Sequence, residues 1–220
     1  MKKLLVSLAA LAAFGANAAT VSFEFGLPVV QSTTEINQTG TLGLFDSTLG
    51  TLTGATLTLT GGATFSFSGT NTAAQTQNAR LTASTDLLFA SSLSALSSFI
   101  TDNIQLSATS GVQSYDVGQT KAFGPLTDSL TKTDDLASIL GSLQAAGGGT
   151  FTINGQTLSA LTVSGGGGNI NTTQATQAGF GASIVYTYST PPTTTVPEPA
   201  SLALVGLALA GIAASRRRKA

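Results

Sequence analysis

The segment ASIVYTYS, residues 182–189, decides the fold class of this chain. The side chains of Ile184, Tyr186 and Tyr188 are spaced by two residues, so in a strand they lie on one face. Alternation of this kind, in β-branched and aromatic residues, is typical of a strand with one buried face. The segment therefore predicts an antiparallel sheet.

The same period of two recurs along the body of the chain. Glycine and asparagine clusters separate the alternating segments, and threonine fills the positions expected to face solvent. We predict an all-β protein, an antiparallel β-sandwich of jelly-roll or immunoglobulin-like type, over residues 19–189. The alternating positions are Val21, Phe23 and Phe25; Leu57 and Leu59; Phe65 and Phe67; Ile104 and Leu106; and Phe151 and Ile153.

Two segments depart from this alternation. In TKTDDLASILGSLQAAGGG, residues 131–149, apolar residues at helical spacing predict one short helix that Thr133 caps and Gly147 ends. Asp134 and Asp135 suit the first turn of such a helix. Residues 87–100 fit either a pair of strands or a loose helix, and we favour strands. The helical positions are Leu136, Ile139, Leu140 and Leu143.

The composition limits the chemistry of the protein. Only 9% of the residues are charged, and the chain contains no histidine, cysteine or tryptophan. Ser–His–Asp triads, disulfides and zinc–thiolate sites are therefore excluded. Residues 20–196 carry three basic and nine acidic side chains, so no basic patch for nucleic acid is expected. The sequence predicts no cofactor and no metal centre.

The remaining polar motifs have structural interpretations. We expect Lys121 and Lys132, the only lysines of the body, to be solvated surface residues. The glycine run 165–168 is expected to be a flexible connection between strands. A threonine-rich adhesin or ice-binding solenoid is disfavoured, because the TLTLT pattern has no fixed repeat. The chain could still be an enzyme that uses two carboxylates as acid and base.

The N-terminus has the pattern of a secretory signal peptide. Lys2 and Lys3 precede an apolar run at 4–14, and Ala16 and Ala18 form a small-x-small cleavage site. We predict that signal peptidase removes residues 1–18.

The C-terminus is a second apolar segment. Residues 200–215 are sixteen uncharged residues, which as a helix cover about 24 Å of a hydrocarbon core of roughly 30 Å. We predict a short transmembrane helix, and we expect Arg216, Arg217 and Arg218 to keep its C-terminal end on the cytoplasmic side. The linker 190–196, TPPTTTV, then separates the domain from the membrane.

Just before this helix lie Pro197, Glu198 and Pro199. We expect this tripeptide to be extended, because proline fixes its own φ and biases the backbone of the residue before it toward extended geometry. Residues 197–219 resemble the PEP-CTERM sorting signal, with the tripeptide, a short hydrophobic helix and an arginine-rich end. The resemblance implies recognition and cleavage by an exosortase, a membrane transpeptidase of Gram-negative bacteria that make extracellular polysaccharide. Arg216, Arg217 and Arg218 belong to the part that is discarded.

A second resemblance lies in GLFDSTLGTLTGATLTLTG, residues 43–61. It resembles the opening of the choice-of-anchor E domain, although Ser47 stands where that family usually has proline. Asp46 itself is interpreted as the first residue of a turn, with Gly50 at positive φ. The matching positions are Phe45, Asp46, Leu49, Gly50 and Leu52.

Together the two ends and the body predict an exported, non-catalytic protein of the cell surface or extracellular matrix. The expected partners are signal peptidase, an exosortase, the membrane during sorting, and exopolysaccharide. The alternative is a secreted polysaccharide-active enzyme that uses carboxylates.

Overall fold

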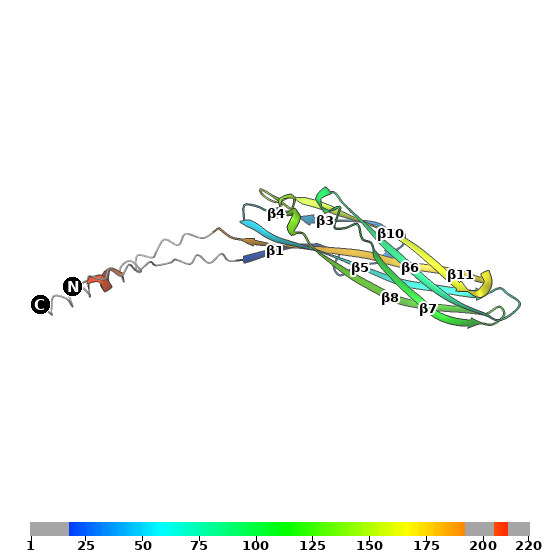
Figure 1. The fold of residues 1–220 in the computed structure, drawn as a ribbon. Coiled ribbons are helices and arrows are strands. Elements are labelled where there is room, and N and C mark those ends of the chain that lie inside the picture. Colours follow the sequence, from blue (N-terminus) through cyan, green and yellow to red (C-terminus); the bar gives the residue numbers. More distant parts are fainter. Residues whose placement is uncertain (1–17, 192–204, 211–220) are drawn as a thin grey trace. The chain divides into compact units, whose positions relative to one another are not determined.

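A computed structural model describes residues 18–191 and 205–210 of the chain. The described residues up to Thr190 belong to one compact unit of long strands (Figure 1). Most of the predicted signal peptide, most of the linker 190–196 and most of the predicted helix 200–215 lie outside the described residues.

Two antiparallel sheets make up the unit, which confirms the all-β prediction. In sheet A the order is β1–β11–β5–β8, and β2 also pairs with β11; in sheet B the order is β3–β10–β6–β7. The parallel pair β4–β9 is not part of the hydrogen-bonded ladder of either sheet. The bounds are β1 (Ala18–Phe25), β2 (Ser32–Thr33), β3 (Asn37–Gly43), β4 (Phe45–Asp46), β5 (Thr51–Asn71), β6 (Gln77–Ser91), β7 (Ile104–Tyr115), β8 (Thr120–Asp135), β9 (Gln144–Ala145), β10 (Thr150–Gly165) and β11 (Ile170–Ser189).

The chain changes sheet between almost all consecutive long strands. Of the long strands, β1, β5, β8 and β11 belong to sheet A and β3, β6, β7 and β10 to sheet B, where only β6 and β7 follow one another directly. This strand order is the connectivity of a jelly roll. It distinguishes between the two sandwich types that the sequence left open.

The core lies between the inner faces of the sheets. Phe180 of β11 contacts Phe25 and Phe89 edge-on, with ring centroids 5.3 and 5.2 Å apart. Tyr186 is fully buried, and its hydroxyl donates to the carbonyl of Gly43 at 2.8 Å. Burial raises the pKa of this phenol. The alternation predicted for residues 182–189 is therefore confirmed, with its aromatic face inward.

Several core aromatic rings lie directly against glycines of the opposite sheet. A Cβ atom on Gly155 would lie 2.3 Å from the ring of Phe180, and one on Gly40 would lie 2.0 Å from the ring of Phe25. Since real Cβ atoms do not approach other atoms this closely, glycine at these two positions is what allows the rings to fill the core.

The edge of sheet A beside β11 is interrupted between β1 and β2. Residues 26–31 cross the outer face of the sheet there, where a Cβ atom on Gly179 would lie 2.2 Å from the carbonyl oxygen of Val30. The side chain of Gln38 replaces the missing strand, because its amide donates to the carbonyl of Phe180 and accepts from the N–H of Phe180. The backbone N–H and carbonyl of Phe180 therefore both have hydrogen-bond partners where the ladder is interrupted.

The helix predicted between Thr133 and Gly147 is wrong at both ends, because β8 covers its start and β9 lies before Gly147, which therefore ends no helix. Strand β8 continues to Asp135, and Thr133 pairs with Thr58 of β5 rather than capping a helix. A 3₁₀ segment, η2 (Ala137–Ser142), follows with Leu136 and Leu143 buried at its two ends. A tight 3₁₀ turn, rather than an α-helix, buries Leu136 and Leu143. Pairing with β5 keeps the residues before Leu136 in a strand.

The strands favoured for residues 87–100 extend only to Ser91. Beyond it the chain forms the short 3₁₀ segment η1 (Ser94–Leu96), so the strand prediction is wrong for residues 92–100. The hydroxyl of Ser91 donates to the carbonyl of Thr152 and accepts from the N–H of Leu93, which turns the chain out of the sheet. The glycine run 165–168 does connect two strands, β10 and β11, as predicted.

We predict that Gly155→Ala destabilises the domain by about 1–3 kcal/mol, because the added methyl group must displace the ring of Phe180. The matched control is Gly141→Ala in η2, where no atom lies within 4 Å of the added Cβ. Thermal unfolding of the two variants checks this. Equal midpoints would contradict the packing described here.

Candidate functional site

The outer face of sheet A is covered with hydroxyl groups. They lie opposite one another on neighbouring strands, and many are joined by hydrogen bonds of 2.8–3.3 Å. Cross-strand pairs of this kind stabilise a sheet and also present a regular polar surface. The bonded pairs are Thr58 with Thr133, Thr60 with Thr131, Ser68 with Thr173, and Thr70 with Thr120.

This face carries almost no charge. The ionisable side chains at outward-facing positions of this sheet are Asp135 at the end of β8 and Glu24 on β1, opposite Ser183 of β11. The outer face of sheet B also has few charges, with Arg80 and Asp86 on β6. A solvent-facing protein surface ordinarily has charged residues at roughly a quarter to a third of its positions. The outer face of sheet A can therefore form hydrogen bonds but offers little to an ionic ligand.

A hollow of about 330 Å³ lies on this face beside the crossing segment 26–31. Its polar lining comes from the amide of Gln31, several hydroxyls and the carboxylate of Asp128, and two glycines also line it. A molecule rich in hydroxyl groups would find both donors and acceptors there. The lining residues are Val29, Gln31, Thr60, Gly61, Gly62, Thr127, Asp128 and Ser129.

Asp46 forms the turn that the sequence predicted. Its Oδ1 accepts hydrogen bonds from the N–H of Thr48 at 2.9 Å, from the hydroxyl of Thr48 at 2.8 Å, and from the N–H of Gly147 at 2.9 Å. The two bonds from Thr48, chiefly the backbone one, lower the pKa of Asp46. Gly50 has φ of +153°, and a Cβ atom there would lie 2.2 Å from the carbonyl oxygen of Ser189. The positive φ is thus confirmed.

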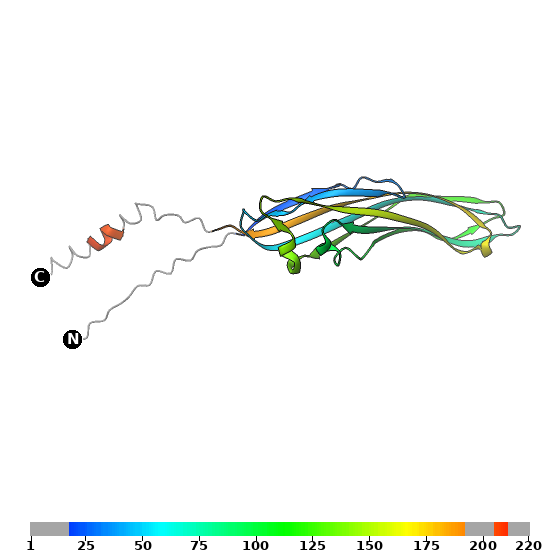
Figure 2. The ribbon, with the colours of Figure 1, turned by 90° about the horizontal axis from the view of Figure 1, so that it is seen from above.

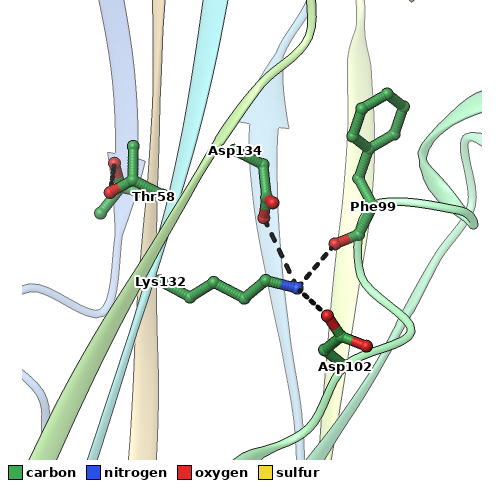
Figure 3. Close-up of polar contacts among 6 residues, drawn as sticks. Thr58, Phe99, Asp102, Lys132 and Asp134 are labelled. Carbon is green, nitrogen blue, oxygen red and sulfur yellow. Dashed lines mark hydrogen bonds and ion pairs between the residues drawn. The ribbon is translucent and has the colours of Figure 1, made fainter.

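Lys132 is not the solvated lysine that the sequence predicted. Its ammonium donates to the carbonyl of Phe99 at 3.0 Å and lies 3.4 Å from Asp102 Oδ2 and 3.8 Å from Asp134 Oδ2 (Figure 3). The side chain is 23% exposed. Asp134 Oδ2 is buried without a hydrogen bond, so this ammonium is its compensating charge.

The segment Ser129-Leu130-Thr131-Lys132 has the spacing of a Ser–Lys catalytic pair, which the sequence interpretation overlooked. In a helix, residues three apart share a face. In β8 they point to opposite faces, because side chains alternate along a strand. Ser129 faces outward while Lys132 reaches Phe99, so they form no nucleophile–base pair. Within residues 18–191 and 205–210, no three acidic side chains are grouped as metal ligands.

The residues predicted to carry the sorting signal are only partly described. Ala16, Pro197, Glu198, Pro199, Arg216, Arg217 and Arg218 lie outside the described residues. Ala18 is the first residue of β1, where it pairs with Ser189. Of the predicted helix 200–215, residues 205–210 are described, and they are helical. No helix in the described part of the chain has the length and apolar character to cross a membrane.

The structure defines the class as an all-β protein whose domain precedes an apolar and then basic C-terminal segment. Residues 195–219 of that segment match the PEP-CTERM protein-sorting motif. The motif implies a protein that is exported, sorted to the cell surface and processed by an exosortase. A comparison with curated proteins found no match.

We predict that Lys132→Met destabilises the domain by about 1–3 kcal/mol, because Asp134 and the carbonyl of Phe99 lose their buried partner. Asp102 is the internal control, since its side chain is 84% exposed. Asp102→Asn should cost less than about 1 kcal/mol. Urea unfolding of both variants measures the difference, and equal losses would show that the Lys132 contact is solvated.

Proposed function

We propose that this chain is an exported, non-catalytic protein of the bacterial cell surface or extracellular matrix. In this proposal, signal peptidase removes residues 1–18, and the C-terminal segment anchors a precursor in the inner membrane of a Gram-negative cell. An exosortase then cleaves near Pro197, Glu198 and Pro199. The observation that carries the proposal is the match of residues 195–219 to the PEP-CTERM sorting motif. The agreement of both predicted ends on one topology supports it.

The distribution of carboxylates supports a non-catalytic role. The hollow beside residues 26–31 contains one acidic residue, Asp128, whose oxygens accept from the N–H groups of Ser107 and Ser129. A second hollow, of about 360 Å³, also contains one, Glu35, which accepts from the N–H of Ser159. Glycoside hydrolysis needs two carboxylates on either side of the scissile bond.

The outer face of sheet A supports association with exopolysaccharide. Its hydroxyl pairs can donate to and accept from sugar hydroxyls, and its few charges, both acidic, favour a neutral polymer over nucleic acid. The choice-of-anchor E resemblance around Phe45 and Asp46 belongs to the same proposal, since such domains accompany sorting signals.

We predict that replacing Pro197, Glu198 and Pro199 with alanine leaves the C-terminal segment attached. Mass spectrometry of the secreted protein should find the wild-type chain ending before residue 200, without its arginine cluster. The triple variant should retain residues 200–220 and stay in the membrane fraction. A wild-type extracellular protein that still carries Arg216, Arg217 and Arg218 would contradict the proposal.

We predict that replacing Thr58, Thr60, Thr131 and Thr133 with valine weakens retention on neutral polysaccharide by tenfold or more in affinity electrophoresis. Valine keeps the shape and strand propensity of threonine but removes the hydroxyl. The matched control replaces two cross-strand pairs of sheet B with valine, Thr41 with Thr152 and Thr82 with Thr162.

Equal retention of both quadruple variants would exclude sheet A as the contact. The alternative, a polysaccharide-active enzyme, is tested in the same preparation. Release of new reducing ends from the polysaccharide, lost when single carboxylates are replaced, would overturn the non-catalytic role.

A further inference from the structure

One side of the sandwich is open over part of its length. β1 and β2 pair with β11 only within residues 177–189, and β3 pairs with β10 only within residues 150–156. Residues 170–176 of β11 and 157–165 of β10 pair with β5 and β6, and in the described part of the chain no strand lies on their other side. Figures 1 and 2 show β10 and β11 running on to the end of the sandwich that β1 does not reach. We call these two stretches the open edge.

The backbone of β11 presents hydrogen-bonding groups at the open edge. Both the N–H and the carbonyl of Phe180 bond to the side chain of Gln38, on the side of β11 away from β5. Backbone groups of residues two apart in a strand point the same way, and the pairing with β5 is regular from residue 170 to Phe180. The N–H and carbonyl groups of Ile170, Thr172 and Gln174 therefore face the open edge.

The open edge lacks the features that normally keep edge strands from pairing, which are charged side chains, proline and bulges. Its residues 157–165 and 170–176 contain neither a charged residue nor a proline. The edge strand on the other side of sheet A is different, since β8 carries Pro125, Lys121 and Lys132 and has an irregular register with β5. The sequence therefore protects one side of the sandwich and leaves the open edge available.

Apolar side chains at the open edge are incompletely covered. Leu161, Val163 and Ile170 pack against the core but remain partly exposed. The cross-strand partner of Val163 on β6, Leu81, is fully buried. A strand placed along the open edge would remove the exposed apolar surface from water, which is favourable.

We propose that the open edge binds the same edge of a second copy of this chain, so that sheet A continues from β11 of one protomer to β11 of its partner. A two-fold axis beside Thr172 places that residue opposite its own copy and Ile170 opposite Gln174 of the partner subunit. Each of these residues has edge-facing groups, so every pair can exchange both backbone hydrogen bonds. A copy of this edge brings no like charges together, because the edge is uncharged.

The chain contains no cysteine, so one introduced cysteine reports on this pairing. The test places Thr172→Cys in the full-length protein, purified in detergent and exposed to a mild oxidant. Hydrogen-bonded antiparallel residues have Cα atoms about 5.5 Å apart, within the range of roughly 4.4–6.8 Å that a disulfide spans. The matched control is Thr127→Cys, at an exposed position of the opposite edge strand β8. Both variants carry the same C-terminal segment, so sharing a micelle affects them equally.

We expect the disulfide-linked dimer to form at least tenfold faster for Thr172→Cys than for Thr127→Cys. Adding Gln174→Pro to Thr172→Cys should slow the reaction about tenfold, because proline removes an edge-facing N–H that β5 does not use. Near-ultraviolet circular dichroism verifies that this double variant is folded.

Equal rates for the two cysteine variants would overturn the inference and leave the open edge to a strand of a different protein. Fast cross-linking that Gln174→Pro does not slow would also overturn it, because the contact would then not be a strand pair. The pairing needs neither the sorting signal nor a polysaccharide, so either result leaves the proposed function intact.

Discussion

The pairing of β5 with β11 is the constraint on which the rest of the domain depends. Twenty residues of β11, from Ile170 to Ser189, run antiparallel to β5 with one irregularity near the end, between Thr187 and Tyr188. The pairing fixes which side chains of each strand point into the core, since a shift of one residue would exchange the faces. The inward-facing aromatic side chains of β5 and β11 and the outward-facing pair Ser68–Thr173 follow from this register. The other three hydroxyl pairs follow from the register of β5 with β8.

Glycines in both sheets make room for groups that pack against them. Gly40 and Gly155 in sheet B lie under the rings of Phe25 and Phe180, and Gly179 lets residues 26–31 cross sheet A. Glycine within a strand costs conformational entropy and packs poorly. Here it provides room for larger groups from elsewhere in the chain, such as the rings of Phe25 and Phe180.

Local pattern was enough to predict strand in parts of β1, β5, β7, β10 and β11, and one turn. Period-two spacing at residues 182–189 gave the correct buried face, and Asp46 forms its predicted turn because that turn needs only neighbouring atoms. The segment after Thr133 shows where local pattern fails. Its leucine spacing fits a helix, but Thr133 pairs with Thr58, which is 75 residues earlier in the sequence. The residues near Thr133 in the sequence therefore give no sign of its partner, Thr58.

The choice between jelly roll and immunoglobulin-like order has the same cause, because strand order depends on contacts between distant segments. The role of Gln38 is another example. Its amide completes the ladder at Phe180, although the two residues are 142 positions apart. The lysine at position 132 was misjudged because a charged side chain on an edge strand is normally solvated, and only the loop at Phe99 and Asp102 encloses it.

The low charge of the strands also bears on the lifetime of the domain outside the cell. Enzymes of the trypsin type cut after lysine or arginine, and the domain offers them only Arg80, Lys121 and Lys132. All three lie within paired strands, on β6 and β8, and none lies in a loop. Proteolytic nicking normally takes place at exposed loop tips. The fold therefore keeps its few susceptible bonds in backbone that such enzymes cannot reach without unfolding it.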